Sequence, residues 1–262
     1  MAYAGESISQ PCNEIVLNKI MYSNKMLERS IIISAHPDDE VLWFSSILDK
    51  VDGVVVCFLD CKSKPVLGPG RKRSLSDYPL RNVSCLEIDE SEAFNGADWK
   101  NPVITKIGLE ISNKNISDKK YQENYVKLRD GLRNKLIGCY NVFTHNPWGE
   151  YGHEDHVQIY RVVKELQTEI KFNLWFTNYC SNRSVNLMLR YISGFDSEYV
   201  TLKTNKILAS SIKNLYLKNR CWTWYDDWEW FNEESFMEDK SSQERLHAYG
   251  HIFPLNLIKV EY

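Results

Sequence analysis

The stretch SIIISAHPDDEVLWF, residues 30–44, decides the fold of this chain. Ser30–Ala35 is a short apolar run typical of a buried strand, and apolar residues then recur at helical spacing over 39–50. The β-branched run GVVVCFL at 53–59 predicts a second buried strand. A strand, a helix and a strand so close in sequence predict a βαβ unit with parallel strands and a right-handed crossover.

The rest of the chain continues to alternate strands with helices. The apolar patterns predict helices over 80–94, 118–139, 153–168 and 204–218, and strands over 103–109, 141–144 and 173–177. Such alternation is typical of a mostly parallel sheet with helices on both faces. We therefore expect a Rossmann-like α/β fold with C-terminal additions.

The domain organisation follows from the position of these patterns. We expect residues 1–28 to form an N-terminal extension of unknown role and residues 29–262 to form a single domain. Its motif-bearing core would span about 30–180, and a helical, aromatic segment would cover 200–262. The polar segment 61–79 is rich in glycine and proline, which predicts a surface loop.

Composition and charge exclude several classes of protein. The net charge of -3 over 262 residues provides no field that would attract nucleic acid broadly. Seven scattered cysteines without Cys-x-x-Cys spacing predict reduced thiols, and the N-terminus lacks the pattern of a secretory signal. No apolar run approaches the ~20 residues of a membrane helix. We expect a soluble, cytoplasmic protein with no integral membrane segment.

Two polar motifs each follow a predicted strand. The charged run at 36–40 lies between apolar segments, and burying such charge is costly unless it is paired or bound to a metal. The second motif, THNPWGEYGHEDH at 144–156, contains three of the six histidines. Ligands in open α/β sheets bind beyond the carboxyl ends of strands. The two motifs are therefore expected to meet in space.

The spacing within each motif suits metal binding. His36 and Asp39 are three residues apart, as are His153 and His156. Two histidines and one aspartate, with the remaining positions left to water, form an open coordination sphere suited to Zn²⁺, and Fe²⁺ or another divalent ion can occupy such a site. The alternative is that the acids at 38–40 only cap a helix N-terminus.

These motifs carry a resemblance to a known family. AHPDDE at 35–40, together with YGHEDH at 151–156, resembles the zinc-dependent N-acetylglucosaminyl de-N-acetylases, which include the phosphatidylinositol-glycan (PIG-L) and LmbE-like enzymes. The resemblance covers roughly residues 30 to 170. It implies hydrolysis of the acetamide of an N-acetylated amino sugar with release of acetate, in the biosynthesis of a glycoconjugate or polysaccharide.

The resemblance also implies roles for individual residues. His36, Asp39 and His156 would hold the metal, and Asp38 would be the general base that takes a proton from water.

The remaining motif residues would assist them. His153 would stabilise the oxyanion or protonate the leaving amine, and Tyr151 would donate a hydrogen bond to the same oxyanion. Asp155 would orient a histidine, and Glu40 would support the site or cap the helix.

Several further residues are candidates for substrate contact. Arg71 and Arg73 lie in the basic stretch GPGRKRS, where cations beside glycines could hold a phosphate- or nucleotide-linked sugar. Arg81 stands in the region where many relatives carry an Arg-x-x-Glu pattern. Trp148 could stack on a sugar ring, and His145 lies beside it in the sequence.

Other interpretations remain open at the level of sequence. His36, Asp38 and His156 also satisfy the two-histidine, one-carboxylate pattern of a non-haem Fe(II) oxygenase, although alternating strands and helices argue against the all-β fold common to those enzymes. A hydrolase of the same fold acting on another amide or an ester, or a metal-binding protein without turnover, is also possible. The segment CWTWYDDWEWF at 221–231 is typical of a core patch, a lid or a ligand platform.

Overall fold

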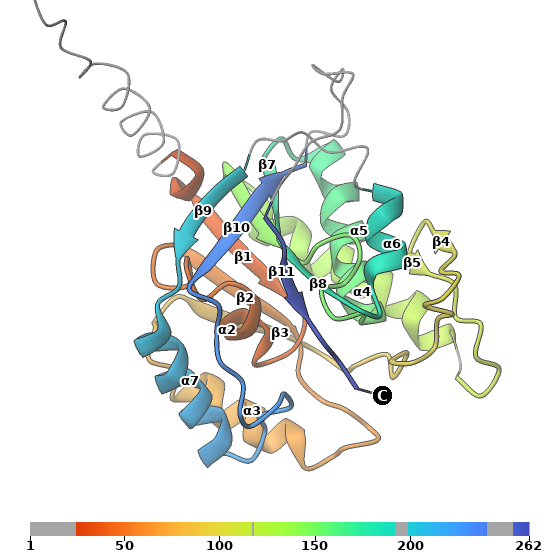
Figure 1. Ribbon diagram of the computed structural model, residues 1–262, viewed down its shortest axis with the longest axis horizontal. Helices are drawn as coiled ribbons and strands as arrows, with labels where there is room; N and C mark the ends of the chain where they lie inside the picture. Colours follow the sequence, from red (N-terminus) through yellow and green to blue (C-terminus); the bar gives the residue numbers. More distant parts are fainter. Residues whose placement is uncertain (1–24, 117, 192–198, 240–253, 262) are drawn as a thin grey trace, which may run out of the picture.

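A seven-stranded sheet forms the centre of the computed structural model, which describes residues 25–116, 118–191, 199–239 and 254–261 (Figure 1). The strand order in the sheet is β3-β2-β1-β6-β7-β10-β9. The strands of this sheet are β1 (Ser30–Ser34), β2 (Gly53–Phe58), β3 (Val83–Ile88), β6 (Asn141–Thr144), β7 (Asn173–Thr177), β9 (Tyr199–Lys203) and β10 (Glu233–Glu238).

The sheet is mostly parallel, as the sequence predicts. The pairs β1–β2, β1–β6, β2–β3 and β6–β7 are parallel, and only β10 runs antiparallel to its neighbours β7 and β9. Ile33 lies opposite Thr144, so β1 and β6 end within one residue of each other. The strand order reverses between β1 and β6, and this switch point is where open α/β sheets bind their ligands.

Helices cover both faces of the sheet, because the side chains of each strand alternate between two cores. Ile31 and Ile33 pack with α4 and α5, whereas Ile32 faces the opposite core, to which α2 and α7 contribute. The helices are α2 (Asp39–Trp43), α3 (Leu67–Ser76), α4 (Lys119–Leu136), α5 (Glu154–Glu169), α6 (Val185–Tyr191) and α7 (Lys206–Lys218). Figure 1 shows α7 and α3 side by side, away from α4 and α5.

Two small sheets complete the described structure. They are the antiparallel pair β4 (Ile104–Thr105) and β5 (Gly108–Leu109), and the parallel pair β8 (Tyr179–Ser181) and β11 (Asn256–Ile258). The strand expected over 103–109 is therefore a short hairpin. The described part of the segment 200–262 contains α7 as expected, but also most of β9 and the strands β10 and β11.

Two sequence-based assignments near β3 are wrong. The helix expected over 80–94 is instead strand β3, because residues 83–88 pair in parallel with β2. The loop expected over 61–79 contains helix α3. Its glycines serve close packing, since a Cβ at Gly68 would overlap the Asp60 carboxylate and one at Gly70 would overlap the main-chain oxygen of Asn219.

Helix α2 is also shorter than the helix expected over 39–50. It ends at Trp43, and the following residues form turns. The buried carboxylate of Glu234 accepts hydrogen bonds from the Ser45 hydroxyl (2.7 Å) and from the Ser46 main-chain nitrogen (2.8 Å). The main-chain N–H of Ser46, which would bond within the helix if α2 were longer, donates instead to this distant carboxylate.

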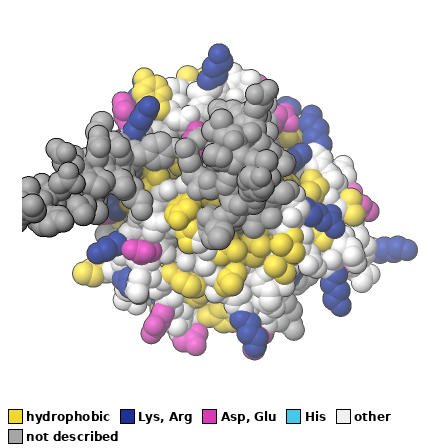
Figure 2. Space-filling view, turned by 45° about the horizontal axis from the view of Figure 1, so that its top comes forward, with side chains coloured by type: hydrophobic (Ala, Val, Ile, Leu, Met, Phe, Trp, Pro, Cys, Tyr) yellow, Lys and Arg dark blue, Asp and Glu magenta, His cyan; other side chains and the backbone are white. Residues whose placement is uncertain are grey.

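The distribution of surface charge and the state of the cysteines agree with what the composition predicts. On the face shown in Figure 2, basic and acidic side chains are dispersed among each other rather than gathered into a basic patch. The cysteines among the described residues are all free thiols. In the described parts of the chain, no helix has the length and apolar character needed to span a bilayer. Of the expected N-terminal extension, residues 1–24 lie outside the described residues.

Candidate metal centre and active-site cavity

The two polar motifs meet at the carboxyl ends of β1 and β6. The link is direct, because the Ala35 main-chain N–H donates to His145 Nε2 at 2.8 Å. At the β1–α2 junction, Asp38 adopts a left-handed conformation with φ 107° and directs the chain into α2. A non-glycine residue in this conformation is strained, and such strain gathers at functional sites.

The three predicted ligands converge on one point. Asp39 Oδ2 lies 2.9 Å from His36 Nδ1 and 3.0 Å from His156 Nε2, and all three side chains are buried. Their ligand atoms lie within 4.8 Å of one another. Asp38 is not a member of this group. The oxygenase pattern, which needs Asp38 as the carboxylate ligand, therefore does not match the arrangement.

A buried network fixes the orientation of His156. Glu150 Oε2 lies 2.8 Å from His156 Nδ1 and 3.0 Å from His145 Nδ1. Because His145 Nε2 accepts from the Ala35 N–H, its proton is on Nδ1 and donates to Glu150. The same carboxylate accepts from the His156 Nδ1–H, which leaves Nε2 facing Asp39. His145 therefore supports the centre from behind rather than contacting substrate.

These residues fit a divalent metal ion. Within the described structure, His156 Nε2 is buried and makes no hydrogen bond of good geometry, although Asp39 Oδ2 lies 3.0 Å away. Two buried ligand atoms that face each other in this way are expected where both bind one metal ion. Two imidazole nitrogens and one carboxylate oxygen are ligands that Zn²⁺ prefers. The carboxylate behind His156 is the arrangement that orients metal-bound histidines in proteins.

The electrostatics of the cluster favour a cation. Burial lowers the pKa of His156, but Asp39 and Glu150 outweigh burial and bring this pKa to about 9. Burial raises the pKa of Asp39, but His156 and His36 outweigh it and hold that pKa well below its ordinary value. The buried carboxylates thus favour a positive charge at this point, and a bound metal ion would supply one.

Asp38 lies beside the ligands and has a separate partner. Its Oδ2 accepts two hydrogen bonds from Thr223, one from the main-chain nitrogen at 2.8 Å and one from Oγ1 at 2.7 Å. Burial raises the pKa of Asp38 to about 7, with a further contribution from the charge of Asp39, while Arg71 and Thr223 oppose the shift. Among the described residues, hydrogen bonds reach only Oδ2 of this carboxylate.

Glu40 supports the junction that presents Asp38. Its Oε2 accepts from the Asp38 main-chain N–H at 2.9 Å, and its Oε1 accepts from the hydroxyls of Tyr78 (2.9 Å) and Tyr216 (2.7 Å). Burial raises the pKa of Glu40 to about 7, against these hydrogen bonds. This carboxylate therefore ties the start of α2 to α7.

His153 and Asp155 lie on the other side of His36. The His153 ring centroid is 4.8 Å from that of His36, and its Nδ1 accepts from the Asp155 main-chain N–H at 3.1 Å. In its neutral form His153 therefore carries its proton on Nε2. Asp155 Oδ2 lies 3.4 Å from His36 Nε2, and its Oδ1 accepts from the Ser91 hydroxyl at 2.5 Å. Burial, together with the charges of His36 and His156, holds the pKa of His153 well below its ordinary value.

A cavity of about 680 Å³ opens beside these groups. His36, His153 and Tyr151 line it, together with Thr223 and Trp224. The Tyr151 ring packs against Trp224, with centroids 4.7 Å apart, and against His156 at 5.2 Å. The cavity thus brings together three segments that are remote in sequence: the two motifs and the aromatic segment 221–231.

The other candidate substrate contacts are only partly brought to the cavity. Arg71 lines it, but its guanidinium is buried, forms an ion pair with Glu90 and donates to the main-chain oxygen of Leu59. Arg73 and Arg81 are exposed and do not line it. Arg81 precedes β3 and so lies at the amino end of that strand, whereas the cavity lies at the carboxyl ends.

Trp148 is not available to a substrate. It is fully buried, packs against Phe176 and donates from Nε1 to the main-chain oxygen of Tyr179 at 2.7 Å. The expectation that Trp148 stacks on a sugar ring is therefore corrected, because the apolar ring belongs to the core under α5.

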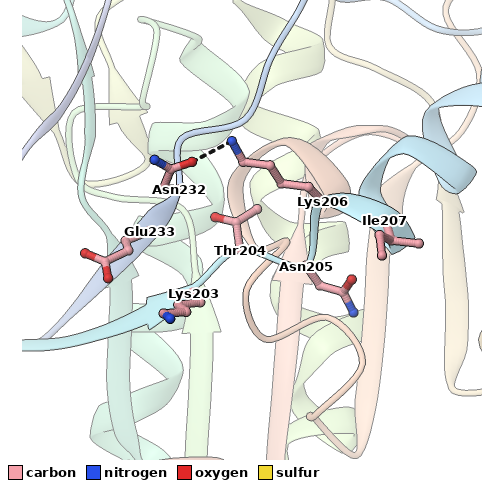
Figure 3. A pocket seen from close by; sticks show the side chains of 7 residues that line it. All are labelled: Lys203, Thr204, Asn205, Lys206, Ile207, Asn232 and Glu233. Carbon is pink, nitrogen blue, oxygen red and sulfur yellow. Dashed lines mark hydrogen bonds between the residues drawn. The ribbon is translucent and has the colours of Figure 1, made fainter.

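A separate hollow of about 470 Å³ lies where β9 leads into α7 (Figure 3). A hydrogen bond of 2.7 Å joins Lys206 Nζ to Asn232 Oδ1 across it. Its lining contains no histidine or cysteine, so it lacks the chemistry of the larger cavity. The lining residues are Lys203, Thr204, Asn205, Lys206, Ile207, Asn232 and Glu233.

Sequence reasoning missed two residues of the site. Glu150 lies inside the second motif, and its place between two histidines could have marked it as a residue that orients them. Thr223 lies 185 residues from Asp38 and carries no signal in the sequence, because an isolated threonine in an aromatic segment has no characteristic pattern.

The fold and the cluster define an α/β protein with a candidate mononuclear metal centre at the switch point of its sheet. Residues 31–167 match the PIG-L family, GlcNAc-PI de-N-acetylase, over more than half of the chain. The chain belongs to this family, which places it among the hydrolytic deacetylases.

Solved structures with a similar arrangement include two deacetylases. A deacetylase–teicoplanin complex from the biosynthesis pathway of teicoplanin is 11% identical, with 80% of this chain and 99% of that chain covered and a TM-score of 0.47. The zinc-inhibited form of teicoplanin deacetylase is 11% identical, with 79% and 97% covered and a TM-score of 0.48. No curated protein matches the sequence.

Proposed function

We propose that this protein is a zinc-dependent deacetylase that hydrolyses the acetamide of an N-acetylated amino sugar and releases acetate. The observation that carries the proposal is the convergence of His36 Nδ1, Asp39 Oδ2 and His156 Nε2 beside the carboxylate of Asp38. Membership of a de-N-acetylase family supports the reaction type. The setting we propose is a cytoplasmic step in glycoconjugate or polysaccharide biosynthesis.

His36, Asp39 and His156 would hold the metal. Bound Zn²⁺ acts as a Lewis acid that polarises a carbonyl and brings the pKa of water towards ~7. A carboxylate is then a sufficient base. Fe²⁺ or another divalent ion could fill the same nitrogen and oxygen ligands.

Three side chains would act on the reacting groups. Asp38, held at Oδ2 by Thr223, takes a proton from the attacking water on its remaining oxygen. The neutral His153 donates a hydrogen bond from its Nε2–H to the oxyanion, and the proton that Asp38 has taken from water passes to the leaving amine. The ring of Tyr151 lies beside those of His153 and His156, and its hydroxyl donates a hydrogen bond to the same oxyanion.

Acetate release from a panel of N-acetylhexosamine compounds tests the proposal. Zinc-loaded protein is expected to release acetate, and Asp38→Asn is expected to abolish turnover while keeping a full metal equivalent by elemental analysis. Asp130→Asn, an exposed change on α4, is the matched control and should leave turnover intact. Normal activity in Asp38→Asn would overturn the base assignment. If the panel gives no acetate while metal is bound, the site hydrolyses a different amide or an ester.

A further inference from the structure

The charge around the cavity gives information about the substrate beyond its acetamide. Its lining contains three carboxylates, Glu90, Glu92 and Glu261, against two cations, Lys64 and Arg71. Because Glu90 is paired with Arg71, the charges that remain on the cavity wall, apart from the metal centre, are Glu92 and Glu261 against Lys64. An anionic aglycone would therefore meet more negative than positive charge there, and like charges placed together disfavour binding.

Neither cation forms a phosphate clamp. The guanidinium of Arg71 is already bound to Glu90 and to the Leu59 main-chain oxygen, so gripping a phosphate would cost a buried ion pair. Lys64 is exposed and is the other cation among the described residues that line the cavity. Arg73 and Arg81, which the sequence suggested as substrate contacts, lie outside the cavity.

Aromatic side chains form another part of the cavity wall. Phe94, Tyr151, Trp224 and Tyr225 all line it. Flat rings of this kind bind the apolar faces of sugars and aromatic groups without requiring charge.

Trp224 is the best-supported of these rings. Its centroid lies 4.7 Å from that of Tyr151, 5.0 Å from that of Tyr225 and 5.3 Å from that of the buried Trp43. Trp43 in turn donates from Nε1 to Asp39 Oδ1 at 2.8 Å. The Trp224 ring is thus held in place next to the metal centre. We call this ring the platform; because it is already ordered, it loses little entropy when a ligand binds.

We propose that the substrate is an N-acetylhexosamine joined to an uncharged aromatic or apolar aglycone that packs on Trp224, rather than a phosphate- or nucleotide-linked sugar. This inference rests on the proposed de-N-acetylation, because it assumes that the acetamide lies at the metal centre. The aglycone then lies along the wall formed by Trp224 and Tyr225.

A comparison of substrates that differ only in the aglycone tests this assignment. We compare kcat/KM for acetate release from phenyl, methyl, 1-phosphate and nucleoside-diphosphate derivatives of N-acetylglucosamine. The phenyl glycoside is expected to exceed the methyl glycoside about tenfold, which is the scale of one aromatic contact, and the two anionic compounds should be the poorest. An anionic compound that equals or exceeds the phenyl glycoside would overturn the assignment while leaving the deacetylase reaction intact.

Variants locate the aglycone. Trp224→Ala should reduce the phenyl glycoside to the level of the methyl glycoside, and Trp224→Phe should keep most of the preference. Trp222→Ala is the matched control, because Trp222 lies in the same segment but does not line the cavity. Glu261→Lys should raise kcat/KM for the anionic compounds only. If the phenyl preference survives in a folded Trp224→Ala protein, this platform does not bind the aglycone.

Binding separates this inference from the proposed function. Quenching of tryptophan fluorescence in Asp38→Asn measures affinity without turnover. If no compound releases acetate, tighter binding of the phenyl than the methyl glycoside, lost in Trp224→Ala, would still support the platform. Equal binding of the two glycosides would refute it.

Discussion

Thr223 holds the carboxylate of Asp38 with its main-chain nitrogen and its hydroxyl, 2.8 and 2.7 Å from Oδ2, across 185 residues of sequence. Two donors on one oxygen fix the rotamer of a residue whose backbone is already constrained at φ 107°. The aromatic segment 221–231 thereby forms a wall of the cavity and also positions the proposed base.

The first prediction concerns this contact. Thr223→Val removes the hydroxyl donor but keeps the shape, and a hydrogen bond to a charged group is worth about 1.5–3 kcal/mol. We expect kcat to fall about ten- to a hundredfold with little change in KM, and Thr223→Ser to restore most of it. Steady-state kinetics on one N-acetylhexosamine substrate measures both. A rise in KM at constant kcat would assign Thr223 to substrate binding instead.

The second prediction concerns Glu150. In Glu150→Gln, an amide group replaces the carboxylate that accepts from the Nδ1–H groups of His145 and His156. The amide nitrogen cannot accept a hydrogen bond and the amide oxygen is a weaker acceptor, so His156 loses its fixed orientation. Residues in this position typically contribute 10- to 100-fold to metal affinity. Zinc affinity by competition with a chromophoric chelator should fall by about that factor. Glu169→Gln, which alters only a surface pair with Arg133, should leave the affinity unchanged.

The third prediction concerns metal removal. A metal at one hundred times its Kd stabilises a folded protein by about 2.7 kcal/mol, so adding zinc to chelator-treated protein should raise Tm by roughly 5–10 °C. His156→Ala should lose this response, because it removes a nitrogen ligand from the cluster. Mg²⁺, which prefers oxygen ligands, serves as the control ion. An unchanged zinc response in His156→Ala would remove this residue from the ligand set.

The fourth prediction concerns Trp148. Trp148→Phe removes the hydrogen bond to the Tyr179 main-chain oxygen and part of a fully buried ring. We expect a loss of about 1–3 kcal/mol in the free energy of unfolding, measured by urea denaturation, and no change in KM. A raised KM at wild-type stability would show instead that Trp148 contacts the substrate.

Local sequence was enough to predict the centre of the fold and of the candidate site. The apolar runs of β1, β2 and β6 identify buried parallel strands, and ligands at i, i+3 spacing follow two of those strands. Because the carboxyl ends of parallel strands share one edge, His36, Asp39 and His156 could be expected together from the sequence alone.

Local patterns were insufficient where a distant partner decides the structure. Residues 83–88 form a strand because β2 offers an edge, and the glycines of α3 permit a helix because they pack against Asp60 and Asn219. Tertiary packing outweighs local propensity at such places, since propensities are small next to burial and strand pairing.

The sequence by itself determined the alternation of strands and helices and the chemistry carried at two strand ends, because both are written in neighbouring residues. Only the tertiary structure decided which cations reach the cavity, which tryptophan lines it and which residue holds Asp38. Those outcomes depend on contacts between residues more than a hundred positions apart, such as Thr223 with Asp38 and His145 with Ala35. No local pattern records such contacts, since they form only when the whole sheet assembles.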